Sequence, residues 1–157
     1  MEEAPRTVIA QLLAPEDILL DLDAATKKRL FEEVARFFAQ RHGLAQAKVF
    51  RSLSAREQLG STGLGQGFAV PHARVEGLRQ AVAAFVRTRL PIAFDAPDDQ
   101  PVSAMVVLLV PALATEQHLQ ILAECAQRFS DRRFREQLRI CVDACSVSRL
   151  FAGWPQS

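Results

Sequence analysis

The clearest pattern along the chain is a stripe of apolar side chains at helical spacing in its first third. The stripe consists of Leu30, Phe31, Val34, Phe37 and Phe38. Charged residues fill most positions between them, as on a helix that buries one face. Asp23 stands where an N-cap is expected, and Gly43 stands where a helix commonly ends. We therefore predict a long amphipathic helix between these two residues.

Shorter helical stripes flank the middle of the chain. One contains Val49, Phe50 and Leu53 and stops at Gly60. Beyond the middle, Thr115 is the expected cap of a helix with the stripe Leu119, Leu122, Cys125 or Ala126, and Phe129. Two more short helices are predicted, one from Asp131 through Phe134 to Leu138 and one over 146–151. A patch from Ile9 to Leu13 is typical of a short helix or turn.

The middle of the chain carries apolar runs that are typical of strands. They span Phe68–Val70, Gln80–Arg89, Ile92–Asp95 and Val102–Val110, and an edge strand is expected at Ile18–Leu20. Pro91 indicates a turn between the second and third of these runs. Residues 105–110 are apolar without interruption, as in a central strand covered on both faces. Helices early and late with strands between them predict an α/β fold, with one mixed sheet sandwiched between helices.

Composition narrows the class of protein without changing this fold. The chain has 157 residues, of which 49% are hydrophobic and 24% charged, and its formal net charge is +1. These values are typical of one folded domain, expected over 1–157 with a frayed tail at 152–157, and they favour no nucleic-acid partner. The first residues lack the features of a secretory signal, and no apolar run is long enough for membrane insertion. We expect a cytoplasmic protein.

Cysteine usage bears on metal and redox chemistry. Cys125, Cys141 and Cys145 are odd in number and lie in apolar or helical sequence, which favours reduced core residues over disulfides. A zinc site would need a CxxC-type pair and a nearby histidine, and the pair Cys141 and Cys145 has neither. We expect no metal.

The segment Gly60–Gly67 reads GSTGLGQG, and its four glycines predict an irregular loop whose amides can approach an anion. It does not match the known nucleotide motifs. Gln66 stands where a P-loop needs lysine, and Phe68 stands where a dinucleotide fingerprint needs glycine. Leu59 stands where a serine nucleophile elbow needs glycine. The loop is therefore predicted to contact phosphate but not to bind ATP or NAD, and no cofactor is expected.

His72 follows Pro71 at the expected end of a strand, where the proline fixes the direction of the next side chain. Taken alone, a histidine here is compatible with a surface or structural role. Polar side chains that can hold a phosphoryl group lie close by in sequence, namely Arg56, Ser61, Thr62 and Arg74. This grouping favours phosphate chemistry at His72.

Two interpretations of His118 stay open on residue pattern alone. His118 shares a helical face with Leu122, Cys125 and Phe129, so it fits the edge of a core stripe. It also falls in the first turn after Thr115, where free amides and the helix dipole favour an anion. His42, beside Gly43, is expected to be a helix-end or solvent residue.

Three segments together resemble a known family. They read AREQLGSTGLGQGFAVPHAR (55–74), LPIAFDAPDDQPVSAMVVLLVP (90–111) and TEQHLQILAECAQRFSDRRFREQL (115–138). They are similar to the enzyme IIA proteins of the phosphoenolpyruvate-dependent phosphotransferase system, in the fructose/mannitol class, and most similar to its nitrogen-regulatory members. The resemblance implies a mixed, about five-stranded sheet with helices on both faces.

The resemblance also implies a phosphocarrier. His72 would accept a phosphoryl group from the phosphohistidine of a small histidine-containing carrier protein, with His118 and Arg56 in the same site. Ser61, Thr62, Gly63 and Arg74 would steady the phosphoryl oxygens. Two residues depart from the family pattern: Phe68 stands where an aliphatic residue is usual, and Ala73 where glycine is common. We expect both to narrow the approach to His72 without removing the acceptor.

Three functions remain open at this point. The first is a regulatory phosphocarrier whose phosphorylation state controls binding to target proteins. The second is a sugar-transport component that passes phosphate to a fructose- or mannitol-type permease domain. The third is a protein-binding regulator that is not phosphorylated.

Overall fold

The computed structural model describes residues 7–154. The predictions of a non-secretory N-terminus and of fraying at 155–157 fall on residues outside this range. Fraying was also expected at 152–154, and there the structure differs. The last helix continues to Ala152, and the Trp154 ring packs against Phe134 with centroids 5.2 Å apart. The chain is thus held in the fold as far as Trp154.

The described residues form one mixed sheet of six strands, in the order β1-β5-β6-β3-β2, with β4 also paired to β6. The strands are β1 (Ile18–Leu22), β2 (Gly63–Gly65), β3 (Phe68–Ala69), β4 (His72–Val75), β5 (Val82–Ile92) and β6 (Val102–Pro111). β5 and β6 are antiparallel, whereas β1 runs parallel to β5 and both β3 and β4 run parallel to β6. The fold class predicted from sequence is confirmed, with six strands in place of about five.

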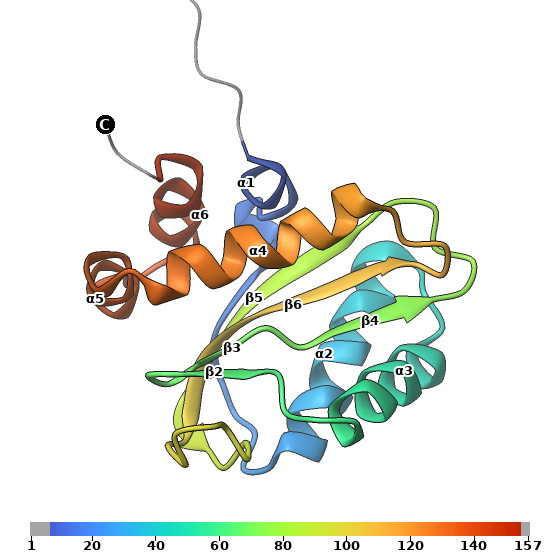
Figure 1. Ribbon diagram of the computed structural model, residues 1–157, viewed down its shortest axis with the longest axis horizontal. Helices are drawn as coiled ribbons and strands as arrows, with labels where there is room; N and C mark the ends of the chain where they lie inside the picture. Colours follow the sequence, from blue (N-terminus) through green and yellow to red (C-terminus); the bar gives the residue numbers. More distant parts are fainter. Residues whose placement is uncertain (1–6, 155–157) are drawn as a thin grey trace, which may run out of the picture.

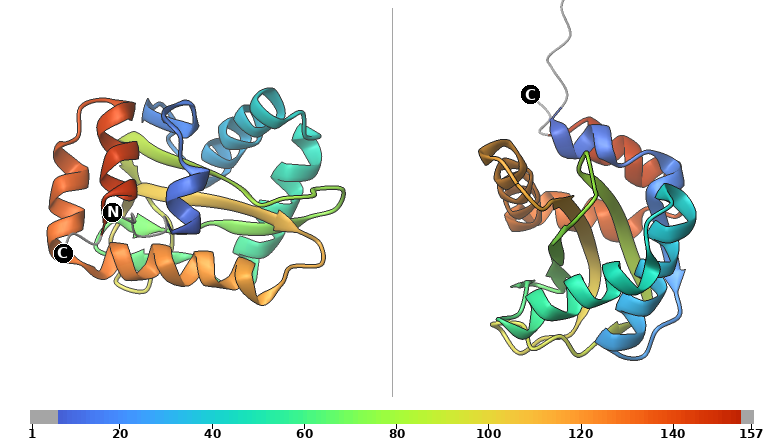
Figure 2. Two further views of the ribbon diagram at one scale, coloured as in Figure 1. Left: turned by 90° about the horizontal axis from the view of Figure 1, so that it is seen from above. Right: turned by 90° about the vertical axis from the view of Figure 1, so that its right-hand side faces the viewer.

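Helices cover both faces of the sheet (Figure 1). α2 (Lys27–His42) and α3 (Gln46–Gln58) lie on one face. The other face carries α1 (Val8–Leu12), α4 (Glu116–Ser130), α5 (Arg132–Ile140) and α6 (Ala144–Ala152), and a short 3₁₀ turn, η1 (Pro15–Asp17), precedes β1. The views in Figure 2 show α4 along one side of this layer.

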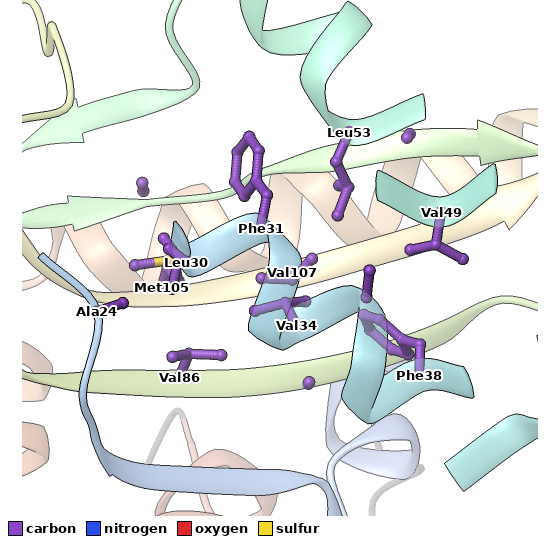
Figure 3. Packing of buried hydrophobic residues seen from close by; sticks show 14 of the residues in the cluster. Ala24, Leu30, Phe31, Val34, Phe38, Val49, Leu53, Val86, Met105 and Val107 are labelled. Atoms are coloured by element: carbon purple, nitrogen blue, oxygen red, sulfur yellow. The ribbon is translucent and has the colours of Figure 1, made fainter. Parts of the chain in front are cut away.

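The helix α2 forms because its apolar stripe meets the sheet. Leu30, Val34 and Phe38 are fully buried against β5 and β6 residues such as Val86, Met105 and Val107 (Figure 3). Gly43 ends the helix in the left-handed region, with φ at 70°, as predicted.

The predicted cap of α2 was wrong. The Thr26 hydroxyl, and not Asp23, accepts the Arg29 N–H at 3.1 Å, and the helix begins at Lys27. Both residue types are good N-caps, so spacing alone did not separate them.

The prediction for β6 is confirmed, because it is buried from Val102 to Val110 apart from Ser103. From Ala104 to Val110 its residues belong alternately to two different cores. Met105, Val107 and Leu109 face α2 and α3, whereas Val106 and Leu108 face α4 to α6. A strand with apolar neighbours on both faces gives an unbroken apolar run.

Two other strand predictions were wrong. Pro91 does not end β5, and Ile92–Asp95 is not a separate strand, because β5 continues to Ile92, which pairs with Val102. The pairing with β1 stops at Thr88, and the β6 register shifts between Arg87 and Ile92. Proline is tolerated at such an edge, where its missing N–H leaves no ladder bond unmade.

The glycine-rich segment is also more regular than predicted. Gly63–Gly65 forms β2 and pairs antiparallel with β3, so the two strands make a small hairpin. Gln66 (φ 60°) and Gly67 (φ 86°) form its tip in the left-handed region. The glycines therefore serve a tight hairpin turn as well as a loop.

The cysteines are free, as expected, but only partly in the core. Cys125 is buried, Cys141 is half-buried, and Cys145 is exposed. Burial raises the pKa of the Cys125 thiol to about 12. Within the described residues no group of three or more histidines, cysteines or carboxylates is placed to hold a metal ion. Every helix in the same range falls short of the length and apolarity that a membrane crossing needs.

Candidate functional site

His72 is the first residue of β4, and not the residue after a strand end as predicted. It lies opposite Leu108 of β6, and Ala73, Arg74 and Val75 continue the parallel pairing. Ala73 and Val75 are buried on the α2–α3 side. Because side chains alternate along a strand, His72 and Arg74 point to the opposite face, toward α4. The polar and apolar alternation of HARV was the sequence signal for this strand.

The tautomer of His72 follows from one hydrogen bond. Its Nδ1 lies 2.8 Å from the main-chain oxygen of Val70. A carbonyl oxygen only accepts, so Nδ1 carries the proton and donates. In the neutral ring the other nitrogen, Nε2, then keeps its lone pair free.

The surroundings of His72 favour the neutral ring. Its pKa lies below the ordinary value of 6.5, mainly because burial disfavours the charged form, and the Arg56 charge acts in the same direction. The bond to Val70 and the Glu57 charge oppose this shift without cancelling it. A neutral ring with a free Nε2 lone pair is the nucleophilic form of histidine.

His72 borders a cavity of about 500 Å³ that is lined by residues of both α3 and α4. Its walls come from α3, β4, β6 and the start of α4, and the residues that carry chemistry there are Arg56, His72, Arg74 and His118. A smaller hollow of about 250 Å³ borders the same histidine and includes Ser61, Thr62 and Gly63. The structure thus gathers residues from four parts of the chain around one imidazole.

Two arginines supply positive charge to the cavity. The Arg56 Nη1 donates to the Gly60 oxygen at 2.8 Å, which ties the end of α3 to the glycine-rich segment. Arg74 is exposed on β4. Within residues 7–154 neither arginine forms an ion pair, so their charges are not neutralised by a carboxylate contact.

His118 occupies the third position of α4, and its Nδ1 accepts the Thr115 N–H at 2.9 Å. This bond gives His118 a structural task that neither sequence interpretation foresaw, because it helps to start the helix. Since Nδ1 accepts, the proton of the neutral ring sits on Nε2. His72 and His118 therefore border one cavity with opposite tautomers, one offering a lone pair and the other an N–H.

The core stripe expected on α4 was partly wrong. Ile121, Cys125 and Phe129 are the buried apolar residues, whereas Leu119 is 56% exposed and lines the cavity. On the opposite wall Leu59 is 86% exposed. His72 thus shares its cavity with two leucines that are largely exposed in the described chain.

The hydroxyls of Ser61 and Thr62 point into the protein. Ser61 Oγ donates to the Phe94 oxygen at 2.9 Å and accepts the Gly63 N–H. Thr62 Oγ1 donates to the Glu57 carboxylate at 2.7 Å, and the residue is only 6% exposed. Both hydroxyl protons are therefore engaged away from the cavity, and these residues border the site mainly through their backbone and carbon atoms.

Four further residues are placed clearly by the structure. Gly63 is required by close packing, because a Cβ there would lie 2.7 Å from the Ala96 Cβ. Phe68 packs against Phe129 with ring centroids 4.9 Å apart and does not border either hollow beside His72, while Ala73 lines the larger one. His42 ends α2 and stacks on Phe38, away from the site.

Sequence reasoning missed Glu57 and Lys27, which are paired at 2.9 Å beneath the glycine-rich segment. A signal was present for Glu57. It follows Val49 and Leu53 at intervals of four and so continues the buried face of α3. Nothing in the spacing of Lys27 marked it.

Comparison with known proteins shows the family. The model of the phosphoenolpyruvate-dependent sugar phosphotransferase system EIIA 2 family matches residues 11–153. A nitrogen regulatory protein of Pseudomonas aeruginosa is 39% identical over 132 residues, covering 83% of this chain and 86% of its own. This chain belongs to the EIIA 2 family of that phosphotransferase system.

Solved structures agree. The crystal structure of the nitrogen regulatory protein IIA-Ntr from Neisseria meningitidis has 46% identity and a TM-score of 0.87, covering 92% of this chain and 99% of that one. Enzyme IIAMTL of Escherichia coli, solved with phosphorylated enzyme IIBMTL, has 22% identity and a TM-score of 0.74, covering 90% and 97% of the two chains. The second likeness concerns the fold alone.

Proposed function

We propose that this protein is a regulatory phosphocarrier that accepts a phosphoryl group on Nε2 of His72 from the phosphohistidine of a small carrier protein. The observation that carries the proposal is the bond from Nδ1 to the Val70 oxygen at 2.8 Å, which leaves Nε2 as the free nitrogen beside the cavity. Membership of the EIIA 2 family supports phosphoryl transfer as the chemistry.

The transfer is an in-line displacement at phosphorus. The Nε2 lone pair of His72 forms the new N–P bond while the donor's N–P bond breaks, and the electron pair of that bond stays on the donor imidazole. The proton on Nδ1 of His72 remains there. The phosphorylated ring then carries positive charge, which the Val70 oxygen stabilises through the same hydrogen bond.

Charge on the transferring group would be held by three side chains that border the cavity. Arg56 and Arg74 are cations without carboxylate partners in the described chain. His118 offers Nε2–H to a phosphoryl oxygen. Donors fixed before the reaction stabilise developing charge without reorganisation, which is where most of the rate acceleration would arise.

The donor must deliver its phosphoryl group by docking. Leu59, Leu119 and Leu122 border the cavity and provide the apolar contact for a protein surface. The exchange would take place in the cytoplasm, with no nucleic acid and no insertion into a membrane.

A regulatory role is favoured over transport because the Pseudomonas aeruginosa and Neisseria meningitidis relatives are named as nitrogen regulatory proteins. The transport alternative rests on the fold of enzyme IIAMTL, which was solved with a phosphorylated enzyme IIB partner. Onward transfer from phosphorylated His72 to a fructose- or mannitol-type IIB domain would favour transport, and its absence with tight binding to a regulatory target would favour regulation. The unphosphorylated regulator remains the third possibility.

The test is incubation with labelled phosphoenolpyruvate and the general carrier proteins of the system. We expect label on the wild-type protein and on His42→Ala, and none on His72→Ala. Equal labelling of wild type and His72→Ala would overturn the proposed acceptor. No label on any of the three proteins would favour the unphosphorylated regulator.

A further inference from the structure

A buried carboxylate lies directly beneath the site. Glu57 is next to Arg56 in α3 and is only 9% exposed. Its two oxygens accept hydrogen bonds from Lys27 Nζ at 2.9 Å, from the Thr62 hydroxyl at 2.7 Å and from the Thr62 N–H at 3.2 Å. A buried carboxylate needs such donors, and here most of them come from one residue of the glycine-rich segment.

Lys27 joins this carboxylate to the loop between β5 and β6. Its Nζ also donates to the Phe94 oxygen at 2.8 Å and lies 4.3 Å from the centre of the Phe94 ring. The Ser61 hydroxyl donates to the same oxygen at 2.9 Å. Ser61 and Thr62 are therefore hydrogen-bonded to the loop between β5 and β6 and to α3, and Lys27 of α2 donates to the same two acceptors.

Thr62 in turn is connected to His72 through a single residue. The Val70 N–H donates to the Thr62 oxygen at 3.0 Å, and the Val70 oxygen accepts from His72 Nδ1 at 2.8 Å. The position of Thr62 thus helps to fix the main chain of Val70 through the Val70 N–H. The Val70 oxygen in turn orients the imidazole of His72 by accepting its Nδ1–H. When that acceptor shifts, nothing else in the described contacts keeps the proton on Nδ1.

We propose that Lys27, Glu57 and Thr62 form a positioning network that keeps His72 in the Nδ1–H tautomer, with Nε2 available as the acceptor of the phosphoryl group. The part about phosphoryl acceptance rests on the proposed function, whereas the part about the tautomer does not. None of the three residues touches the transferring group. Their effect reaches His72 through Val70.

A purely structural role for the same network makes a different prediction, and a matched control separates the two. Thr88 is also 6% exposed, and its hydroxyl donates to a main-chain oxygen, that of Leu90, at 2.7 Å. Thr88→Val therefore removes a buried threonine hydroxyl of the same kind at a place away from His72. Thr62→Val removes the bond to Glu57 while keeping the shape of the side chain, and Thr62→Ser keeps the hydroxyl.

The experiment combines ¹⁵N spectra of the histidine side chains with single-turnover transfer from the phosphorylated donor. For Thr62→Val we expect the two ring nitrogens of His72 to lose their Nδ1–H pattern and the transfer rate at saturating donor to fall by about tenfold. Thr62→Ser and Thr88→Val should keep the wild-type spectrum and rate. Glu57→Gln, which keeps the shape of the side chain but weakens the ion pair, should change His72 in the same direction as Thr62→Val.

A folded Thr62→Val protein with wild-type ¹⁵N shifts at His72 would overturn the proposal at any transfer rate. If transfer were also slower in that protein, Thr62 would act on the donor and not on the tautomer. If Glu57→Gln fails to fold, Thr62→Val alone decides. A wild-type protein that shows the Nδ1–H pattern but accepts no phosphoryl group would contradict the proposed function. The ¹⁵N shifts of the variants would then still test whether the network sets the tautomer of His72.

Discussion

At the scale of single residues, the site depends on which ring nitrogen of each histidine is engaged. His72 donates from Nδ1 to Val70, and His118 accepts at Nδ1 from Thr115. The free Nε2 of His72 therefore offers a lone pair, and the free Nε2 of His118 offers an N–H. These are the groups needed to attack phosphorus and to hold one of its oxygens. Each tautomer follows from a hydrogen bond to a main-chain group that can only accept, as the Val70 oxygen does, or only donate, as the Thr115 N–H does.

The pH dependence of His72 is the first prediction. Because burial lowers its pKa below 6.5, more than half of the His72 rings should be neutral at pH 6.5, and the loss of transfer rate in acid should have its midpoint below that pH. The pKa of His72 is 6.5 in the unfolded chain and lower in the folded protein. At a pH between these two values the unfolded chain binds more protons, so the free energy of unfolding should fall as the pH falls. A ¹H NMR titration of the His72 ring checks this. A midpoint at or above 6.5 would contradict it.

Sequence alone singled out His72 and Arg56 as candidate site residues, and the structure places both at one cavity, but it did not indicate the buried carboxylate of Glu57. Pro71-His72 and Arg56 were found through family likeness together with residue type. Glu57 was missed because a charged residue on a helix is usually assigned to solvent, and its burial depends on Lys27 and Thr62, which come from other parts of the chain. Partners distant in sequence are not visible in local patterns.

At the scale of elements, the start of α4 joins helix formation to chemistry. The imidazole of His118 takes the place that glutamate or glutamine has in a capping box, since it accepts the N–H of the N-cap residue Thr115. Removing the side chain would disturb both the helix and the site. A variant that keeps the cap separates these effects.

His118→Gln is that variant. A glutamine oxygen can accept the Thr115 N–H, so we expect stability within about 0.5 kcal/mol of wild type, and His118→Ala should lose about 1 kcal/mol. Transfer at saturating donor should slow by roughly a hundredfold in His118→Ala, because the N–H donor is lost, and by less in His118→Gln, whose side-chain amide can still donate. Urea unfolding and single-turnover transfer measure the two effects. A wild-type rate in folded His118→Ala would leave His118 as a capping residue only.

The hairpin of β2 and β3 gives a prediction about packing. A Cβ at Gly63 would lie 2.7 Å from the Cβ and 3.1 Å from the Cα of Ala96, so Gly63→Ala should lower the free energy of unfolding by about 1–3 kcal/mol. The second change Ala96→Gly should recover part of this loss in the double variant. Urea unfolding of all four proteins gives the coupling, and additive effects would show that the two residues do not interfere.

Elements with a strong apolar pattern were predicted well from sequence, and those set by long-range pairing were not. The stripe of α2 and the unbroken run of β6 reflect burial on one or both faces. β4 has only the four residues His72–Val75, and β2 is mostly glycine, so each is a strand because β6 or β3 lies beside it.

At the scale of the whole molecule, the two layers of helices have different tasks. α3 supplies Arg56 and Glu57, while α4 supplies His118 and also closes the second core. This core lies under α4, α5 and α6, and Arg128 of α4 links it to residues near both ends of the described chain. The Arg128 Nη2 donates to the Thr7 hydroxyl at 2.8 Å and to the Trp154 oxygen at 3.1 Å.

Arg128→Ala should therefore affect stability and not chemistry. The side chain is 4% exposed, and its loss leaves the Trp154 oxygen without this donor, so we expect the free energy of unfolding to fall by about 1–3 kcal/mol. Arg132→Ala, at an exposed pair with Glu136, is the control and should change stability little. The transfer rate of folded protein should match wild type in both. A large loss of rate in Arg128→Ala would show that α4 transmits strain to His118.

We propose that Nε2 of His72 carries the phosphoryl group while Nδ1 stays hydrogen-bonded to the Val70 oxygen. The ¹⁵N–³¹P coupling in ¹⁵N-histidine-labelled protein, after phosphorylation by the donor, tests this most directly. We expect coupling to Nε2 of His72 and an Nδ1 shift typical of a hydrogen-bond donor. Coupling to Nδ1, or a phosphoryl group on any other residue, would contradict it.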